Sequence, residues 1–432
     1  MSMAREYYDV IVTGAGPAGL MAAVTASGEG ASVLILEKNS EAGKKLLLTG
    51  HGRCNITNLR IPDNFREKYH ENARFLTSAF SSFSPEETRE FFLALGVPTH
   101  EEEDGRIFPD SQKAETVRNA LVKALSECGA VLLTEAPVIS IRWKDSDEMW
   151  EVNSQAGTFV SRSLILATGG ATFPATGSTG DGYRFAKSLT HTVTPLAPAL
   201  APILLSGRKE DGTSAMPALA AGLTLPAVGI CLLVENKKVA CSEGELLFTH
   251  QGISGPAAMA LSRKLPKEEE LYSSGNVTVK VDMLPDLSRE MAEEKLLHSM
   301  QAFPNRHMKR LLCETFHLAE KVAEFVVEED AAANTVTKEE RRKILSRLKE
   351  SSWKVEKRTS MDVAYVTSGG VSVKEIIPKT MMSRIKRGLF FCGELMDIDG
   401  ASGGYNLQCA WSTGFVAGRS AALVAKEEHE EN

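Results

Sequence analysis

The first forty residues constrain the fold more than any other part of the chain. A β-branched run over residues 8–13 predicts a buried parallel strand, and the turn after it has the pattern Gly14-x-Gly16-x-x-Gly19. A helical segment follows, and a second apolar strand over residues 33–36 ends at Glu37. Strand, glycine turn, helix, strand and acid in this order are typical of a βαβ unit that binds a dinucleotide.

Each part of this turn has a physical role. Gly14 permits the tight turn, Gly16 lets the backbone approach a pyrophosphate, and Gly19 lets the helix pack closely on the strand. The helix N-terminus offers free N–H groups to the phosphates. Glu37 stands about 20 residues beyond the turn, where it can accept hydrogen bonds from an adenosine ribose. Because all parts are in register, we interpret the turn as a ligand site rather than as a purely structural loop.

Composition limits the remaining possibilities. A chain of 432 residues with 43% hydrophobic and 24% charged residues is typical of a globular protein with two or three domains. The net charge of −7 argues against a nucleic-acid footprint over the whole surface. Seven scattered cysteines without a CxxC pair favour reduced thiols over a disulfide framework, and we predict no metal site.

No targeting or membrane segment is evident. Glu6 and Asp9 interrupt the N-terminus, so it does not resemble a signal peptide. The uncharged stretch Ala215–Val234 is long enough to cross a bilayer, but proline and glycine interrupt it, which favours short buried strands. We therefore expect a cytoplasmic protein without membrane contact.

Later segments extend the nucleotide-binding theme. Apolar strands over residues 163–168 and 389–392 each run into glycine, which predicts one sheet assembled from distant parts of the chain. Between them, residues 194–281 have the short apolar runs of a small β domain, and residues 286–350 have a helical pattern. No second GxGxxG follows a strand, so a separate NAD(P)H-binding domain is not evident.

The loop over residues 49–58 is a candidate part of the site. Arg53 could neutralise a pyrophosphate, and Lys44 and Lys45 could do the same or form a solvated face. His51 is a weak candidate for a general acid or base. Cys54 has no second cysteine nearby, which favours packing over redox chemistry. Three further loops are rich in glycine, and each has either a purely structural role or a place at the ligand site: residues 176–183, 248–256 and 367–371. In the structural interpretation, Asp181 and Ser254 are candidate helix caps.

Taken together, these motifs resemble a known family. The segments TGxGRCNxTN, FTHxGISGP, TSGGV and FCGExxDxxGxxGGYNLQxAxxxG are similar to those of the BaiN/YhiN-type FAD-dependent flavoproteins, which include aminoacetone oxidases and bile-acid dehydro-reductases. The resemblance implies an α/β fold with an FAD-binding Rossmann-like domain over residues 1–193 and 357–432. It also implies a β-barrel-like domain, 194–281 and about 350–356, and a helical insertion, 282–349.

The resemblance also implies the residues that contact FAD. The glycine turn would hold the pyrophosphate, the end of the second strand the adenosine ribose, and the backbone of Val138 the adenine. Residues 44–55 would line the central part of the cofactor, and residues 167–169 would cover its ADP half. Residues 393–397 would contact the ribityl chain, and residues 404–407 the pyrimidine edge of the flavin. These residues are Gly14, Ala15, Gly16, Pro17, Ala18, Gly19, Glu37, Lys38, Lys44, Lys45, Arg53, Asn55, Val138, Ala167, Thr168, Gly169, Gly393, Glu394, Asp397, Gly404, Tyr405, Asn406 and Leu407.

We therefore predict an FAD-dependent oxidoreductase that acts on a small organic substrate, with NAD(P)H and O2 as candidate redox partners. The inserted β domain would cover the flavin, which makes His250 a second weak catalytic candidate beside His51. The alternative is a nucleic-acid-associated flavoprotein that uses the basic residues near Arg306 and Arg341 of the helical insertion, although acidic residues are interleaved there.

Overall fold

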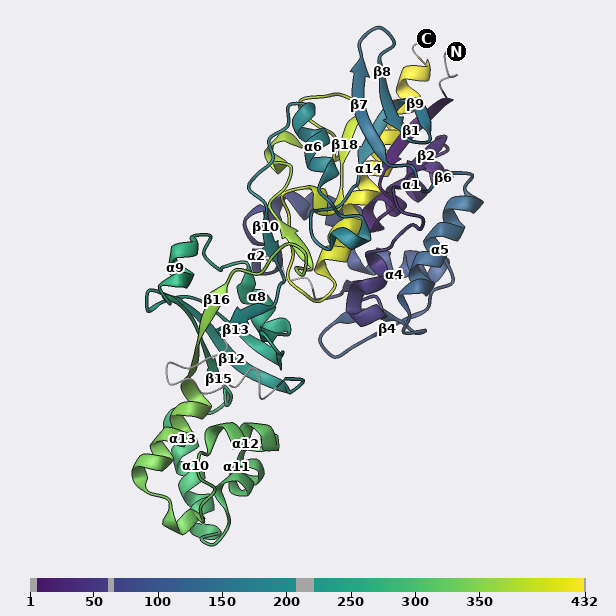
Figure 1. Cartoon of the computed structure of the whole chain (residues 1–432). Helices are drawn as coiled ribbons and strands as arrows, with labels where there is room; N and C mark the ends of the chain where they lie inside the picture. Colours follow the sequence, from purple (N-terminus) through teal and green to yellow (C-terminus); the bar gives the residue numbers. More distant parts are fainter. Residues whose placement is uncertain (1–5, 61–65, 207–220, 431–432) are drawn as a thin grey trace. The chain divides into compact units, whose positions relative to one another are not determined.

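The computed structural model describes residues 6–60, 66–206 and 221–430. The chain forms two compact units. The first comprises Met1–Ala197 together with Tyr365–Asn432, and the second comprises Pro198–Ala364. The first unit is therefore built from the two ends of the chain, as the purple and yellow ribbons of Figure 1 show.

A seven-stranded sheet forms the centre of the first unit. Its order is β6-β2-β1-β9-β8-β7, with β18 paired to β9. The strands β6, β2, β1, β9 and β18 are parallel to one another, whereas β8 is antiparallel to both β9 and β7. The strands are β1 (Glu6–Thr13), β2 (Val33–Leu36), β6 (Val131–Leu133), β7 (Val138–Lys144), β8 (Met149–Ser154), β9 (Gly157–Leu166) and β18 (Leu389–Phe391).

The register of these strands determines where a ligand can bind. Thr13 is aligned with Leu36 and with Leu166, and Leu166 is aligned with Phe391. Four parallel strands thus end at one edge of the sheet, and ligands of open α/β sheets bind outside that edge. The predicted Rossmann-like α/β class, assembled from discontinuous segments, is confirmed.

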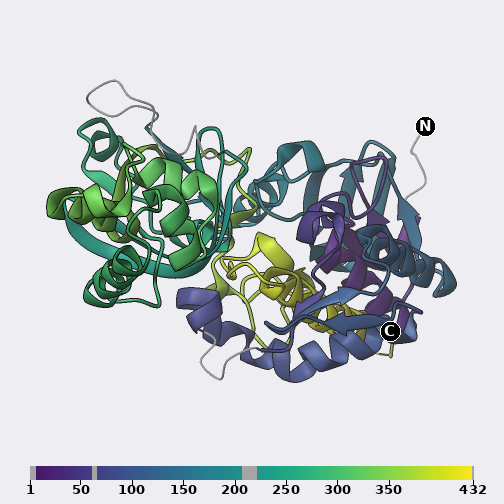
Figure 2. The same cartoon turned by 90° about the horizontal axis from the view of Figure 1, so that it is seen from below.

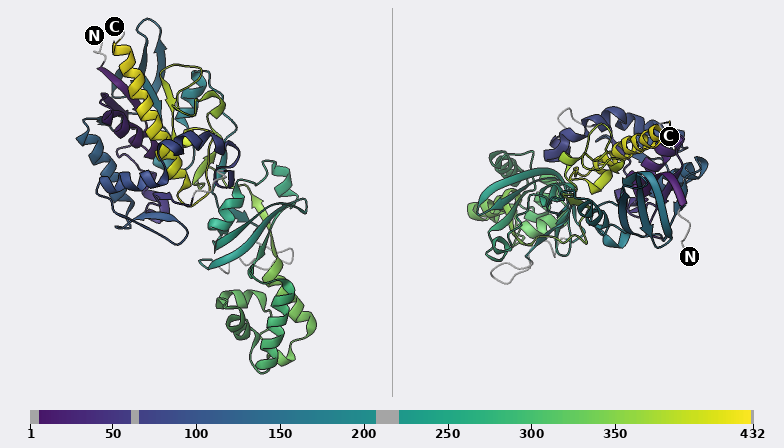
Figure 3. Two further views of the ribbon diagram at one scale, coloured as in Figure 1. Left: turned by 180° about the vertical axis from the view of Figure 1, so that it is seen from behind. Right: turned by 90° about the horizontal axis from the view of Figure 1, so that it is seen from above.

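Two helices pack together against this sheet. They are α1 (Pro17–Gly28) and α14 (Tyr405–Glu430), and Figure 3 shows the long yellow α14 beside the sheet. A Cβ atom at Gly414 would lie 2.4 Å from the carbonyl oxygen of Ala18, and one at Gly418 would lie 2.2 Å from that of Ala22. The two backbones therefore approach so closely that only glycine fits at these positions of α14.

Shorter elements complete the first unit, and β3, β5 and β4 form a small antiparallel sheet of their own. They are η1 (Leu46–Gly52), β3 (Thr57–Asn58), α2 (Arg66–Tyr69), η2 (His70–Leu76), α3 (Thr77–Ser82), α4 (Pro85–Ala94), β4 (Thr99–Glu101), β5 (Arg106–Pro109), α5 (Ala114–Glu127), η3 (Pro174–Thr176), α6 (Asp181–Ser188), β17 (Val366–Ser368), η5 (Val373–Glu375) and η6 (Gly393–Leu395). The short strand β10 (Ala197–Ala199) contains the boundary between the two units.

The second unit contains a closed barrel in the order β11-β14-β13-β12-β15-β16, with the green helices of Figure 2 gathered beside it. Its strands are β11 (Ile203–Leu205), β12 (Thr224–Val234), β13 (Lys237–Phe248), β14 (Gly252–Ser254), β15 (Val277–Asp282) and β16 (Ser351–Lys357). Its helices are α8 (Pro256–Ser262), α9 (Glu269–Ser273), α10 (Arg289–Ala302), α11 (Met308–Phe316), α12 (Glu320–Val326), η4 (Ala333–Thr335) and α13 (Lys338–Glu350).

One hydrophobic core serves the barrel and the helices of this unit. Alternate residues of β15, such as Val279, point inward and meet Trp353 of β16, and the same buried cluster continues to Leu296 of α10 and Leu345 of α13. The division between a β domain and a separate helical domain at residues 281 and 282 therefore stays a prediction. The candidate cap Ser254 belongs to β14, and Gly255 occupies the N-cap of α8 without a side-chain hydrogen bond, so that interpretation is wrong.

The expectation of entirely reduced thiols is also wrong. Cys231 of β12 stands directly opposite Cys241 of β13, and the two form a disulfide. The two cysteines are ten residues apart, so no CxxC motif marks them in the sequence. The register of the β12–β13 hairpin alone brings their side chains together. Within the described residues, no helix has the length and apolarity needed to cross a membrane. Part of Ala215–Val234 belongs to β12, and residues 215–220 lie outside the described residues.

Candidate functional site

The three glycines of the first turn differ in what surrounds them. Gly14 has a φ of +94°, and a Cβ atom there would lie 2.7 Å from the carbonyl oxygen of Ala167. A Cβ atom at Gly19 would lie only 1.9 Å from the carbonyl oxygen of Gly14. A Cβ atom at Gly16, the N-cap of α1, would meet nothing within 4 Å, so space is open in front of the helix N-terminus. That open space fits a pyrophosphate.

Glu37 is buried beside this turn. One carboxylate oxygen accepts a 2.8 Å hydrogen bond from the backbone N–H of Ala15, and the other accepts two hydrogen bonds from Asn39. The backbone of Glu37 also pairs with Leu133 and Ala136, which places the start of β7 at Val138 nearby. The arrangement orients a carboxylate next to the glycine turn. Its contact with a ribose, and that of Val138 with an adenine, stay predictions.

Lys38 is held by the loop before α6. Its ammonium group lies 2.8 Å from a carboxylate oxygen of Asp181 and also donates to Thr179. Partial burial works against the charge of Asp181, but hydrogen bonds from Lys38 and Thr179 outweigh it and lower the pKa of this carboxyl group. The expected cap role of Asp181 is wrong, because Asp181 is the first residue of α6 and Gly180 stands at the N-cap.

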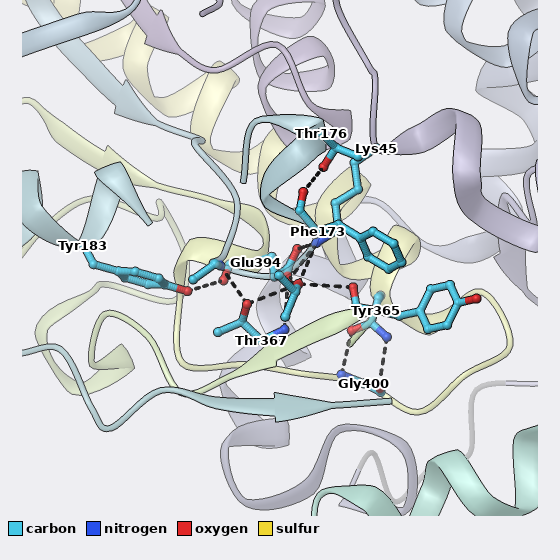
Figure 4. Close-up of polar contacts among 11 residues, drawn as sticks. Lys45, Phe173, Thr176, Tyr183, Tyr365, Thr367, Glu394 and Gly400 are labelled. Carbon is cyan, nitrogen blue, oxygen red and sulfur yellow. Dashed lines mark hydrogen bonds and ion pairs between the residues drawn. The ribbon is translucent and has the colours of Figure 1, made fainter. Parts of the chain in front are cut away.

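A half-buried polar network lies at the carboxyl edge of the sheet (Figure 4). The ammonium group of Lys45 lies 2.9 Å from the carboxylate of Glu394 and donates to the hydroxyl of Thr172 at 2.9 Å. The same carboxylate accepts a 2.8 Å hydrogen bond from the backbone N–H of Thr367. Glu394 thus joins three loops that lie far apart in the sequence. Lys44, in contrast, is exposed.

Two further residues support this network. The hydroxyl of Tyr183 donates to the carbonyl oxygen of Glu394 at 3.5 Å, and burial raises the pKa of Tyr183 well above its ordinary value. A Cβ atom at Gly170 would lie 2.2 Å from the hydroxyl oxygen of Thr367, so glycine is required there. The sequence did not point to Thr172 as a member of the site. The only hint near it was the pair Gly169-Gly170, which marks a turn after the strand.

The N-terminus of α14 presents unpaired backbone donors. Its first intrahelical hydrogen bond runs from Gln408 N–H to the carbonyl oxygen of Gly404 at 3.0 Å, so the N–H groups of residues 405–407 have no partner within the helix. The side chain of Asn406 bonds both the N–H and the carbonyl group of Gly400, at 2.8 Å each. This fixes the loop that leads into the helix and fits the predicted contact with an electron-rich edge of a flavin.

The loop over residues 49–58 braces that helix end. With its amide oriented to satisfy both neighbours, Asn55 accepts from Gly404 N–H and donates to the carbonyl oxygen of Thr57, at 2.9 Å each. Asn58 donates to the carbonyl oxygen of Gly403 at 3.0 Å. Cys54 is fully buried, and burial raises its pKa to about 12, which keeps the thiol protonated at neutral pH.

Arg53 and His51 have other surroundings. The guanidinium group of Arg53 lies 3.0 Å from the carboxylate of Glu102 and 3.9 Å from the ring centre of Phe108. It already has an anionic partner, so its contact with a pyrophosphate stays a prediction. His51 is exposed at the end of η1 with a φ of +57°. His250 is exposed in the second unit, in the turn closed by Thr249 and Gly252, and its place beside a flavin stays a prediction.

Two polar groups near the strand ends have no partner among the described residues. The hydroxyl oxygen of Thr168, just beyond β9, is buried without a hydrogen-bond partner among the described residues. Asp397 follows η6, and its carboxylate makes no hydrogen bond or ion pair within the described part of the chain. Together with the open space at Gly16 and the free donors of α14, these groups fit a long cofactor that carries phosphates and hydroxyl groups.

Comparison with known proteins gives consistent results. The family model described as HI0933-like protein Rossmann domain matches residues 8–420. The chain is 32% identical to 3-dehydro-bile acid delta(4,6)-reductase of Clostridium scindens, covering 95% of this chain and 98% of that protein. It is 30% identical to ribosomal RNA dihydrouridine synthase of Haemophilus influenzae, covering 96% and 98%. A solved quinol-fumarate reductase has a similar fold, with a TM-score of 0.50 and 16% identity over 99% of this chain and 72% of that one.

Proposed function

Because this chain belongs to the HI0933-like family and is an FAD-dependent oxidoreductase, we propose that it reduces a carbon–carbon double bond conjugated to a carbonyl group. The resemblance drawn from the motifs, the enzyme class and the cofactor predicted from the sequence are thereby confirmed. The substrate and the electron donor are part of the proposal.

The observation that carries the proposal is the chemistry common to two full-length relatives. A reductase of delta(4,6) double bonds in a 3-dehydro bile acid acts on alkenes conjugated to a ketone. Formation of dihydrouridine saturates the C5–C6 bond of uracil, which is conjugated to the C4 carbonyl group. In both cases a hydride adds to an electrophilic carbon of the conjugated system, which is the β-carbon of an enone or of uracil and the δ-carbon for the outer double bond of a dienone, and a proton adds to the adjacent carbon. The shared bond change is therefore a better guide to this chain than either substrate.

Bound FAD supplies the hydride in such a reaction. The protein supplies position and charge. The free N–H groups at the start of α14 favour negative charge next to them, and the Asn55 and Asn406 side chains hold that helix end in place. The Lys45–Glu394 pair and Thr172 fix the loops at the carboxyl edge of the sheet. Because these groups are held by one another through hydrogen bonds, little reorganisation is required of them in the reaction.

Ion pairs of three arginines in the helical insertion argue against a strongly basic surface for RNA there. The arginines near residue 306 that suggested a nucleic-acid surface are paired, because Arg306 and Arg310 both contact Glu314. Arg341 lies 3.4 Å from the carboxylate of Glu293. Paired cations release fewer counterions on binding to phosphates, so they contribute little to RNA affinity. Uridine in RNA is the second candidate, supported by the name of the Haemophilus influenzae relative.

Anaerobic reoxidation of the flavin tests the proposal. The purified protein is first reduced with NADH, NADPH or dithionite, and then mixed with a steroid 4-en-3-one, with uridine 5′-monophosphate, or with ribosomal RNA. We expect the enone to restore the oxidised flavin spectrum and to gain two mass units. If ribosomal RNA reoxidises the flavin and the other two compounds do not, the second candidate, uridine in RNA, would be favoured. A reduced flavin that reacts with O2 but with no conjugated carbonyl compound would contradict the proposal.

A further inference from the structure

We propose that Phe173 and Tyr365 form an aromatic face that holds the ring system of the substrate. This inference rests on the proposed function, because it assigns the recognition of a flat, unsaturated ring to two named side chains. Both residues belong to the first unit, and neither was singled out by the sequence.

The two rings lie together and remain accessible. Their centroids are 5.3 Å apart with an interplanar angle of 58°, which is a favourable tilted arrangement (Figure 4). The side chain of Phe173 is partly exposed, and Tyr365 is 40% exposed. Two neighbouring aromatic rings that keep apolar surface in water offer a contact face for another ring.

The backbone at Phe173 is strained. Its φ is +52°, in the left-handed region that bulky side chains rarely adopt. The carbonyl oxygen of Phe173 accepts hydrogen bonds from the N–H and the hydroxyl group of Thr176, at 2.8 and 2.7 Å, and these bonds hold the strained turn. Strain of this kind persists where surrounding contacts enforce it, and it is concentrated at ligand sites.

The loop that carries Phe173 runs between the two ends of the cofactor site. At one end, the side chain of Asn39, which also bonds Glu37, donates to the carbonyl oxygen of Thr176 at 3.0 Å. At the other end, Thr172 receives the hydrogen bond from Lys45, and its hydroxyl group lies 3.4 Å from the carbonyl oxygen of Tyr365. The aromatic pair is therefore joined directly to the Lys45–Glu394 network at the carboxyl edge of the sheet.

The position of the aromatic pair beside the Lys45–Glu394 network favours a particular kind of ligand. A charged network fixes the loops, and beside it the aromatic pair offers apolar ring faces and one phenol hydroxyl group. A fused or single ring with a conjugated carbonyl group buries apolar area on these faces. Phosphate groups gain nothing from these faces.

Binding titrations of three variants test the assignment. The variants Phe173→Leu and Tyr365→Leu remove the rings, whereas Tyr365→Phe keeps the ring. Leu93→Ala, which changes an exposed apolar residue elsewhere in the same unit, is the matched control. The probes are 3-oxochol-4-en-24-oic acid and uridine 5′-monophosphate, and the readouts are the ligand-induced change in flavin absorbance, the FAD content and the thermal melting temperature.

We expect Phe173→Leu and Tyr365→Leu to raise the Kd of the steroid probe about tenfold, and Tyr365→Phe and Leu93→Ala to change it less than about twofold. The FAD content should equal that of the wild type in all four. Unchanged affinity in the ring-removing variants, or loss of FAD from them, would overturn this inference alone, the latter because the rings would then cover the cofactor. A wild-type protein that binds neither probe would overturn the proposed function and this inference with it.

Discussion

The carboxylate of Glu394 lies 2.9 Å from the ammonium group of Lys45, although 349 residues separate the two in the sequence. Lys45 follows the second strand of the βαβ unit, and Glu394 follows β18 near the other end of the chain. Their pairing ties the two terminal segments of the first unit together at the carboxyl edge of the sheet, where we expect the cofactor to bind.

Removal of the Glu394 carboxylate should loosen three loops at once. In Glu394→Ala, the ammonium group of Lys45 and the backbone N–H of Thr367 lose their shared acceptor. We expect the free energy of unfolding to fall by about 1–3 kcal/mol, since partly buried donors are left unsatisfied. Glu394→Gln keeps an acceptor for Thr367 and should lose less. Urea unfolding of both variants checks this order, and equal stability of Glu394→Ala and wild type would contradict it.

The glycines of the first turn should separate cofactor binding from folding. Gly16→Val places a side chain in the open space before α1, so FAD binding should be abolished while the apoprotein melts within a few degrees of the wild-type apoprotein. Gly19→Val drives its Cβ atom into the carbonyl oxygen of Gly14, so the apoprotein itself should be destabilised. Flavin absorbance and circular dichroism of the apoproteins measure the two effects. Full FAD occupancy in Gly16→Val would remove this turn from the site.

His191 should make stability depend on pH. The ring is buried against Phe391 and bonds the hydroxyl group of Ser383 at 2.7 Å. Burial lowers its pKa below the ordinary value, the charge of Lys386 adds to this, and that of Glu375 opposes it. Below about pH 6.5 the unfolded chain therefore binds a proton that the folded chain resists, and stability is lost as the pH falls.

The change can be isolated with His191→Gln, which keeps a polar side chain that does not titrate. Between pH 7.5 and pH 5.5, the free energy of unfolding of the wild type should fall more than that of the variant, by at most about 1.4 kcal/mol per pH unit. Parallel pH profiles of the two proteins would show that His191 is not the group responsible.

The Cys231–Cys241 disulfide should stabilise the barrel of the second unit. Double substitution to serine should lower the free energy of unfolding by about 2–3 kcal/mol, because a cross-link between these strands restricts the unfolded chain. Dithiothreitol should destabilise the wild type to a similar extent and leave the double variant unaffected. Alkylation followed by mass spectrometry gives an independent check, since seven reactive thiols in the unreduced, unfolded protein would mean that no disulfide forms.

The local parts of the fold were predictable from the sequence. The strand over residues 33–36 has the predicted bounds, and the positive φ of Gly14 follows from the turn that the fingerprint requires. Each depends on backbone preferences and burial within a few residues, which short-range sequence patterns record. The motifs also identified the family, because they sample sites along nearly the whole chain.

Only the tertiary structure determined which distant residues meet. The Lys45–Glu394 pair, the Cys231–Cys241 disulfide and the contact of Gly414 with α1 depend on strand register and helix packing. The pairing of Asp181 with Lys38, where the sequence suggested a helix cap, has the same origin. Such contacts arise when elements pack to bury apolar surface, and a side chain's partner is then set by the position of whole elements. The sequence by itself determined the local elements and the glycine turn after the first strand, whereas folding in three dimensions determined the network around them.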